Sequence, residues 1–158
     1  MTKEKIQDAI YSRRYVYNFH FLLIWATKYR HQTFSTKELA DEMKDILRMV
    51  AKDNEIVIEK MEVMPDHVHV LISFPPSKAP TSAIKALKGR SAFIFLKRHP
   101  EIRQSQYWGG HLWSPSYYMS TLGNMSKDVA ENYNIFAKNS FARSVLGALK
   151  KSFGLPFS

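Results

Sequence analysis

The chain has 158 residues, 23 Lys and Arg against 14 Asp and Glu, a formal net charge of +9 and no cysteine. This length fits one domain, and 45% hydrophobic and 13% aromatic content excludes a disordered chain. The lack of cysteine excludes disulfide scaffolds, thiolate metal sites and thiol nucleophiles. No apolar run approaches the roughly 20 residues of a membrane span, so the composition predicts a soluble basic domain with a polyanionic partner such as nucleic acid.

Hydrophobic periodicity predicts the order strand, helix, strand, strand, helix, strand, followed by one more helix. Strands are expected where apolar residues alternate or form short runs bounded by proline or glycine; they are Tyr15–Lys28, Glu55–Val63, His67–Phe74 and a segment near Leu112–Ser120. Helices are expected where a capping residue precedes apolar residues at helical spacing. The first begins at Ser35–Glu38, which resembles a capping box, and runs to about Asn54; the others run from Thr81 to before Pro100 and from Ser126 through Phe136.

This order is typical of the ferredoxin-like split βαβ fold of the α+β class. One antiparallel sheet is covered on one face by two helices, and the last predicted helix follows at the C-terminal end. The other face of the sheet is free for a ligand or an extra element. The same fold hosts RNA-binding modules and nucleic-acid enzymes, so the fold alone does not select a function.

The most informative stretch is Met64–Ile72, which contains His67-Val68-His69. Side chains two residues apart on a strand point to the same face, so the two imidazoles are predicted to stand side by side. Neutral imidazoles at this separation can bind one divalent ion. The alternative is a pair of surface histidines on a solvated face, and two ligands make only half of a metal site.

Four segments resemble the small single-tyrosine transposases of the insertion sequence 200/605 family, a branch of the HUH nucleases that moves single-stranded DNA. They are Trp25–Arg30, Met64–His69, Lys88–Ser91 and Leu112–Tyr118. Their order and spacing match over roughly residues 15–133. The resemblance implies a catalytic domain over residues 15–138, an N-terminal extension of residues 1–14 and a C-terminal tail of residues 139–158 with no assigned role.

The resemblance also implies a reaction. In this family a divalent ion, Mg²⁺ or Mn²⁺, polarises a DNA phosphate that a tyrosine on a helix attacks, leaving a 5′-phosphotyrosine link and a free 3′-hydroxyl. No nucleotide cofactor is needed, because the covalent link conserves the phosphodiester energy. Family members bind imperfect DNA hairpins at element ends, act as homodimers with joined sheets, and work in the cytoplasm of bacterial or archaeal cells. The odd-numbered residues of the Tyr15–Trp25 strand would suit an edge that pairs with a second copy.

Tyr133 matches the position of the attacking tyrosine on the last predicted helix. Its spacing from Val129 and Phe136 is also compatible with plain packing, and Tyr117 and Tyr118 are the next candidates. The family usually places a glutamine, the third metal ligand, four residues after the tyrosine. That position is Ala137 here, which predicts metal binding weaker than usual and activity that is impaired or absent.

The basic residues that match family segments are the expected DNA contacts; they are Lys28, Arg30, Lys88 and Arg90, with Tyr29 as a base-stacking residue. Trp108 and Trp113 are further stacking candidates, although Trp113 equally suits the core. Lys97 and Arg98 are expected to be a solvated face. Two other functions stay open: a degenerate relative that binds or nicks hairpins without transposition, and a catalytically inert nucleic-acid-binding module.

Overall fold

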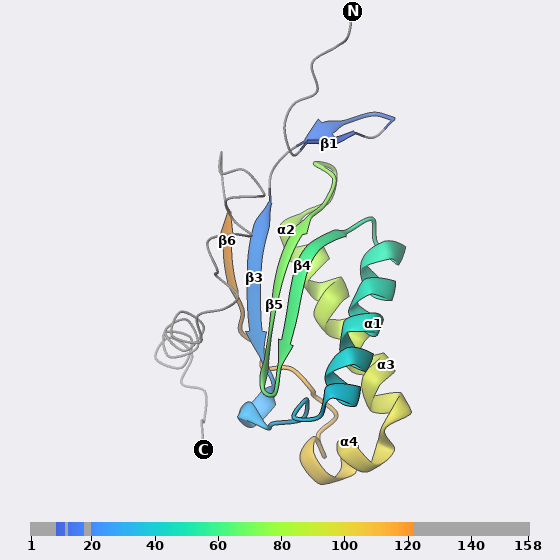
Figure 1. Cartoon of the computed structure of the whole chain (residues 1–158), viewed down its shortest axis with the longest axis vertical. Helices are drawn as coiled ribbons and strands as arrows, with labels where there is room; N and C mark the ends of the chain where they lie inside the picture. Colours follow the sequence, from blue (N-terminus) through green and yellow to red (C-terminus); the bar gives the residue numbers. More distant parts are fainter. Residues whose placement is uncertain (1–8, 12, 18–19, 122–158) are drawn as a thin grey trace, which may run out of the picture.

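A four-stranded antiparallel sheet with strand order β4-β5-β3-β6 forms one layer of the protein, and helices form the other (Figure 1). The computed structural model describes residues 9–11, 13–17 and 20–121. The sheet strands are β3 (Phe21–Ala26), β4 (Val57–Met64), β5 (His67–Ser73) and β6 (Tyr118–Thr121). This strand order confirms the predicted ferredoxin-like α+β fold. The predicted C-terminal helix with Tyr133 lies outside the described residues.

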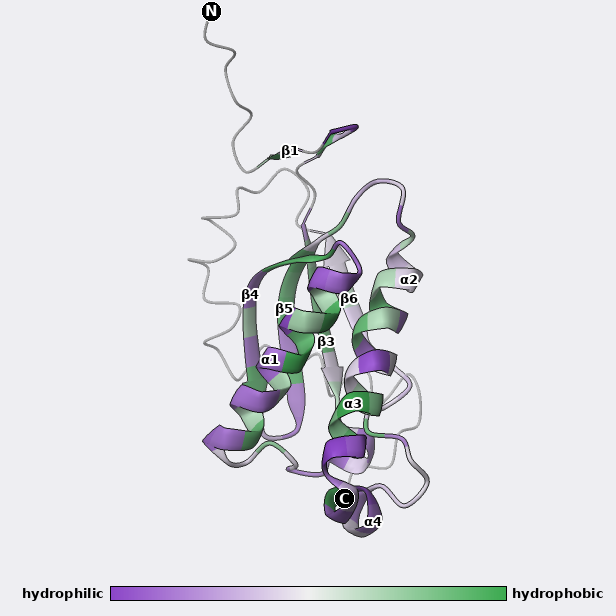
Figure 2. Cartoon of the chain, turned by 90° about the vertical axis from the view of Figure 1, so that its right-hand side faces the viewer, coloured by the Kyte–Doolittle hydropathy of each residue, from purple (hydrophilic) through white to green (hydrophobic). Residues whose placement is uncertain are grey.

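The helical layer lies on one face of the sheet (Figure 2). In chain order it contains α1 (Lys37–Asp53), α2 (Pro80–Lys85), the π-helical turn η2 (Ala86–Arg90), α3 (Ser91–Arg98) and α4 (Pro100–Gln106). The predicted first helix is confirmed, and Thr36 caps it by accepting a hydrogen bond from the Leu39 amide at 3.3 Å. None of the helices in the described residues is both long and apolar enough to cross a bilayer.

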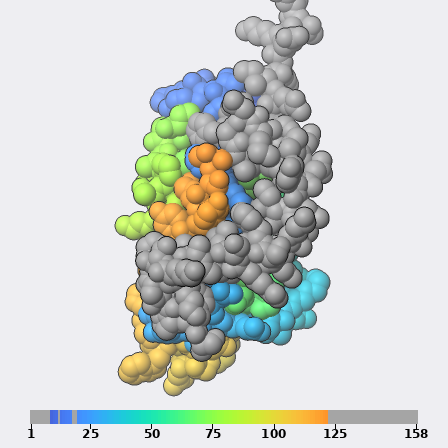
Figure 3. Space-filling model, turned by 90° about the vertical axis from the view of Figure 1, so that its left-hand side faces the viewer, coloured from blue at the N-terminus to red at the C-terminus, as the bar shows by residue number. Residues whose placement is uncertain are grey.

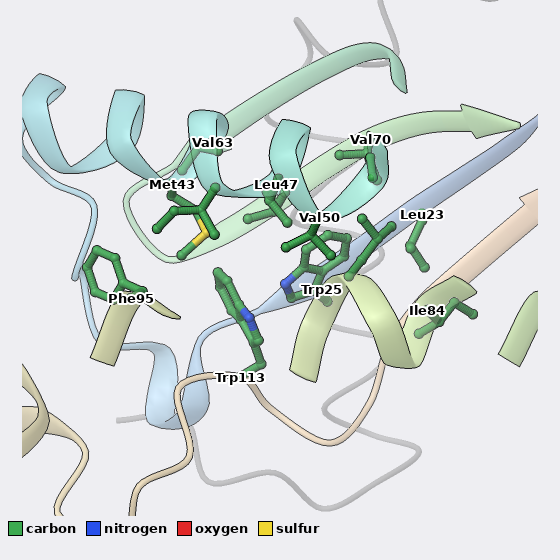
Figure 4. Packing of buried hydrophobic residues seen from close by; sticks show 14 of the residues in the cluster. Leu23, Trp25, Met43, Leu47, Val50, Val63, Val70, Ile84, Phe95 and Trp113 are labelled. Carbon is green, nitrogen blue, oxygen red and sulfur yellow. The ribbon is translucent and has the colours of Figure 1, made fainter. Parts of the chain in front are cut away.

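The core fills the space between the sheet and the helices (Figure 4). Leu23 and Trp25 of β3 and Val70 of β5 point toward the buried side of α1 and α3. The Trp25 ring meets that of Trp113 edge to face, with ring centroids 5.6 Å apart. Trp113 donates its indole N–H to the Ser91 hydroxyl at 3.0 Å, which satisfies a buried donor. Trp113 therefore serves the core and is not a stacking surface for DNA.

The predicted long first strand is wrong, because the structure divides it in two. Val16–Tyr17 forms β2 and pairs with β1 (Ile10–Tyr11) in a separate small sheet. Only Phe21–Ala26 enters the main sheet, where β5 and β6 flank it on both sides. The expectation that odd-numbered residues of this strand form a free edge is therefore also wrong, since Leu23 and Trp25 are fully buried.

Two further predictions needed correction in the second half. The helix expected from Thr81 is interrupted by η2, although its predicted buried residues Leu87 and Phe95 are buried. Helix α4 was not predicted, because its seven largely polar residues carry no apolar period and bury no side chain. The strand expected near Leu112–Ser120 is confined to β6, preceded by one bridge between Thr27 and Trp113.

Candidate functional site

Strand β5 places His67 and His69 on the face of the sheet that the helices leave uncovered. Val68 and Val70 alternate with the histidines and belong to the core, so the imidazoles must point to the opposite face. Figure 3 shows the molecule from this side, with β6 in orange beside β3. The centroids of the two imidazole rings are 4.8 Å apart, and the rings are inclined by 30°. The predicted side-by-side placement is confirmed, and both residues are buried, with exposed fractions of 8% and 2%.

His67 contacts Asp66, which in turn contacts Arg30. Its Nδ1 lies 2.6 Å from Oδ1 of Asp66, and Arg30 donates its Nε–H to Oδ2 of Asp66 at 2.8 Å. Nη2 of Arg30 lies 2.6 Å from the same oxygen. Burial acts to raise the pKa of Asp66, but the hydrogen bonds from His67 and Arg30 and the charge of Arg30 outweigh it, so this pKa lies below its usual value.

The donor atoms of the pair suit a divalent cation. Burial, reinforced by the nearby His67, lowers the pKa of His69 to about 4, so that this imidazole is neutral at pH 7. Nε2 of His67 is buried and has no hydrogen-bond partner within the described structure. Two neutral imidazoles can supply two metal ligands. Within the described ranges, no three histidine, cysteine, aspartate or glutamate side chains converge as a complete ligand set.

The turn that follows β3 lies next to Asp66, between β4 and β5. It contains the short 3-10 helix η1 (Lys28–Arg30), in which Tyr29 and Arg30 adopt left-handed backbone angles, with φ of 60° and 56°. The Thr27 amide donates to the Asp66 carbonyl at 2.9 Å and so ties this turn to the start of β5. Tyr29 is 46% exposed, and the ammonium of Lys28 lies 5.1 Å from its ring centroid. The turn thus carries an exposed aromatic ring and a cation, and its Arg30 contacts Asp66.

Lys88 and Arg90 come from η2, in the helical layer. Nζ of Lys88 donates to the carbonyls of Ser114 and Ser116 at 2.7 and 3.1 Å. This segment also pairs with the end of β3, because the Ser114 amide donates to the Ala26 carbonyl at 2.9 Å. Lys88 is therefore anchored in the protein, whereas Arg90 is exposed. A π-helical turn is a feature that recurs at functional sites, and here it carries both cations.

A family model described as IS200-like transposase matches residues 15–134, more than half of the chain. This chain belongs to that family. The ISDra2 transposase TnpA of Deinococcus radiodurans is 44% identical over 121 residues, which cover 77% of this chain and 85% of that protein. The transposase for insertion sequence element IS200 of Salmonella typhimurium is 26% identical over 115 residues, covering 73% and 74%.

Two solved structures resemble this transposase. A crystal structure from Deinococcus radiodurans, assigned as a transposase, is 39% identical with a TM-score of 0.64, covering 82% of this chain and 96% of that one. A REP-associated tyrosine transposase bound to a REP hairpin has 18% identity and a TM-score of 0.51, covering 78% and 67%. The second likeness concerns the fold alone. Both support the two-layer architecture described above.

Of the three tyrosines that are candidates for the nucleophile, the structure describes Tyr117 and Tyr118. Tyr133 and Ala137 lie outside the described residues. Tyr117 is exposed at 36% and its ring centroid lies 5.6 Å from the Lys88 ammonium. Tyr118 begins β6 opposite Ile24, in the same cross-strand row of the sheet as His69. Trp108 is 87% exposed and remains available for stacking.

Sequence reasoning missed the roles of Asp66 and Thr27. Asp66 stands next to His67 in the motif, and that adjacency was the one available signal, because a carboxylate often fixes a metal-binding imidazole. Its pairing with Arg30 spans 36 positions and depends on the fold. The guanidinium of Arg30, which was predicted to contact DNA, therefore already contacts Asp66.

The buried ammonium of Lys88 predicts a pH-dependent stability. Burial lowers the pKa of Lys88 to about 8, against 10.5 for an exposed lysine. Between these values the unfolded chain binds more protons than the folded one, so the free energy of unfolding should rise with pH through this window. The expected contribution is on the order of 1–2 kcal/mol. A neutral amine still has two N–H donors for the two carbonyls.

Urea unfolding at several pH values compares the wild type with Lys88→Met. The difference between the two proteins should grow from about pH 8 to 10, since methionine cannot titrate. The exposed Lys85 in α2 provides the matched control, and Lys85→Met should shift stability equally at all these pH values. A Lys88→Met difference that is constant with pH would show that the folded protein keeps this lysine charged.

Proposed function

We propose that this transposase cuts and rejoins single-stranded DNA by transesterification, with a divalent ion held by His67 and His69 and with Tyr133 as the nucleophile. The observation that carries the proposal is the buried imidazole pair on the face of the sheet opposite the helices, with Asp66 in contact with His67. When bound there, Mg²⁺ or Mn²⁺ would polarise the scissile phosphate and offset the charge that grows on its oxygens.

The chemistry of the nucleophile follows from the atoms involved. The phenol oxygen of Tyr133 attacks phosphorus, and a Tyr–O–P bond forms as the P–O3′ bond breaks. The phenol loses its proton, and the departing 3′ oxygen gains one and becomes a hydroxyl. Such a hydroxyl can attack another phosphotyrosine in the reverse sense, which rejoins DNA without a nucleotide cofactor.

The η1 turn and the π-helical turn supply the proposed DNA contacts. Lys28, Arg30, Lys88 and Arg90 are the proposed cations, and Tyr29 and Trp108 expose rings on which unpaired bases can stack. The Lys88 ammonium donates to two protein carbonyls, so its contribution would come through its charge and the segment it anchors. The proposed substrate is a DNA hairpin at the end of an insertion sequence, and the REP-associated structural neighbour is bound to a REP hairpin.

The proposed homodimer would join two sheets. Since β3 is internal, the strands available at the edges of the described sheet are β4 and β6. Strand β4 carries a bulge between Ile58 and Lys60, which twists an edge locally and restricts how a second strand can pair with it.

The second candidate function is to bind or nick DNA hairpins without transposition, as a degenerate relative of the family would. It is suggested by Ala137, which stands where the family resemblance predicts a glutamine. Two imidazoles alone bind a divalent ion weakly, so cleavage would need a high metal concentration or be absent. Calorimetric titration with Mn²⁺ measures this affinity directly. An affinity typical of the family, together with normal cleavage, would contradict weakened binding.

One assay tests the proposed function. Wild-type protein is incubated with a single-stranded hairpin oligonucleotide and Mn²⁺ and run on a denaturing gel. We expect a protein–DNA adduct that survives denaturation, requires the metal and disappears with EDTA. Salt-sensitive binding without any adduct would favour the inert or degenerate function instead.

A further inference from the structure

Asp66 lies at the corner between β4 and β5, and its two carboxylate oxygens have different partners. Oδ1 lies 2.6 Å from Nδ1 of His67, and Oδ2 receives both contacts from Arg30. An ionised carboxylate can only accept hydrogen bonds, so Nδ1 of His67 must carry the proton. In the neutral form of this imidazole the lone pair is then on Nε2, which is the atom without a hydrogen-bond partner within the described residues.

We propose that Asp66 and Arg30 are positioning residues for His67. Asp66 fixes the tautomer and the ring orientation of His67, and Arg30 holds the carboxylate in place through its second oxygen. This inference rests on the proposed metal-binding function of the histidine pair. It assigns Arg30 a role within the protein that differs from the DNA contact expected of a basic residue beside an exposed tyrosine.

The backbone of the η1 turn supports this assignment. Two consecutive residues with side chains, Tyr29 and Arg30, adopt left-handed angles that such residues seldom take. Strain of this kind persists where the surrounding contacts impose it. Here the Thr27 amide binds the Asp66 carbonyl at 2.9 Å, and the Thr27 hydroxyl lies 2.8 Å from the His31 carbonyl. The turn is thus fastened on both sides of the strained residues, and Arg30 reaches Asp66.

A guanidinium is the side chain that suits this geometry. Nε and Nη2 of Arg30 approach the same carboxylate oxygen from one planar group. A lysine at position 30 would keep the positive charge but would offer a single flexible ammonium. Arg30→Lys therefore tests whether the planar pair of donors, and not the positive charge alone, holds Asp66.

The test measures Mn²⁺ affinity by calorimetry on full-length protein without DNA. Asp66→Ala and Arg30→Gln should each weaken Mn²⁺ binding by about 10- to 100-fold, the usual effect of losing an outer-shell partner of a metal-binding histidine. Arg30→Lys should also weaken it. Lys28→Gln is the matched control, because this cation in the same turn should alter DNA affinity and leave Mn²⁺ affinity unchanged.

A second readout needs no metal. Nitrogen-15 NMR of the neutral imidazole of His67 should show a protonated Nδ1 and an unprotonated Nε2 in the wild type. Asp66→Ala should yield a mixture of tautomers. Asp66→Asn leaves one acceptor oxygen for the donors of His67 and Arg30, so it should weaken the preference for the protonated Nδ1 and lose part of the Mn²⁺ affinity. This conservative variant protects the test if Asp66→Ala fails to fold.

The outcomes separate the inference from the proposed function. If the wild type binds Mn²⁺ and Arg30→Gln, Arg30→Lys and the Asp66 variants bind it equally well, the positioning role is overturned. If the wild type binds no Mn²⁺, the metal-binding function fails, and the NMR comparison still decides the inference. A single His67 tautomer that persists unchanged in Asp66→Ala would then overturn it, and a mixture would support it.

Discussion

Alanine in place of His67 or His69 should reduce metal-dependent cleavage of single-stranded DNA on the order of 10³-fold or more. Each substitution removes one of the two imidazoles that β5 places side by side and that are proposed to bind the metal. Metal polarisation of a phosphate is worth several kcal/mol of barrier, and each 1.36 kcal/mol corresponds to tenfold in rate. Cleavage of a labelled hairpin oligonucleotide in Mn²⁺ measures the effect, and calorimetry should show the matching loss of metal affinity.

The matched control for these variants is His111→Ala, because His111 is an exposed histidine that precedes the buried Leu112. It should cleave like the wild type. Thermal unfolding of each variant shows whether the sheet survives the substitution. A folded His69→Ala protein that cleaves at the wild-type rate in Mn²⁺ would contradict a catalytic role for the pair. It would indicate that the two buried histidines have a structural role only.

Phenylalanine in place of Tyr133 should abolish the covalent protein–DNA adduct while hairpin binding is preserved. The substitution removes only the phenol oxygen, so no Tyr–O–P bond can form, and the aromatic ring remains for packing. Loss of a nucleophile typically costs on the order of 10³-fold or more in rate. Denaturing gels detect the adduct, and a gel shift at constant salt measures hairpin affinity.

Two matched substitutions, Tyr117→Phe and Tyr118→Phe, test the alternative nucleophiles. Tyr117 is partly covered by the cation of Lys88, and Tyr118 belongs to a strand that is paired to β3. Both constraints limit how far these side chains can move toward a phosphate, so both variants should retain the adduct. An adduct that survives Tyr133→Phe and vanishes in Tyr118→Phe would move the nucleophile to the sheet.

The fold was predictable where local patterning and tertiary packing agree. The alternation of Leu23 and Trp25 along β3 and the helical spacing of Met43 and Leu47 in α1 match the sides that are buried (Figure 4). The first strand was predicted too long because alternation continues across Tyr17, although the chain there pairs with β1 in another sheet. Pairing partners far apart in sequence decide such boundaries, and periodicity does not encode them.

The histidine pair of the site could be predicted from the sequence, whereas the contacts of the residues around it could not. The spacing of His67 and His69 on a strand determines that they share a face. The contact between Arg30 and Asp66 could not be derived, because it requires a left-handed turn at two residues that carry side chains. Lys88 was expected to contact DNA. It lies in the π-helical turn that interrupts the predicted helix, and its ammonium donates to the carbonyls of Ser114 and Ser116, which are distant in sequence.

The proposed reaction requires Tyr133 and the histidine pair together to cut single-stranded DNA. Mass spectrometry of the trapped adduct after nuclease and protease digestion tests it most directly, in parallel samples with Mn²⁺ and with EDTA. We predict that one peptide, containing Tyr133, carries a 5′-phosphorylated nucleotide in the Mn²⁺ sample and that no peptide does so in EDTA. A nucleotide on another residue, or one that forms equally well in EDTA, would contradict the claim.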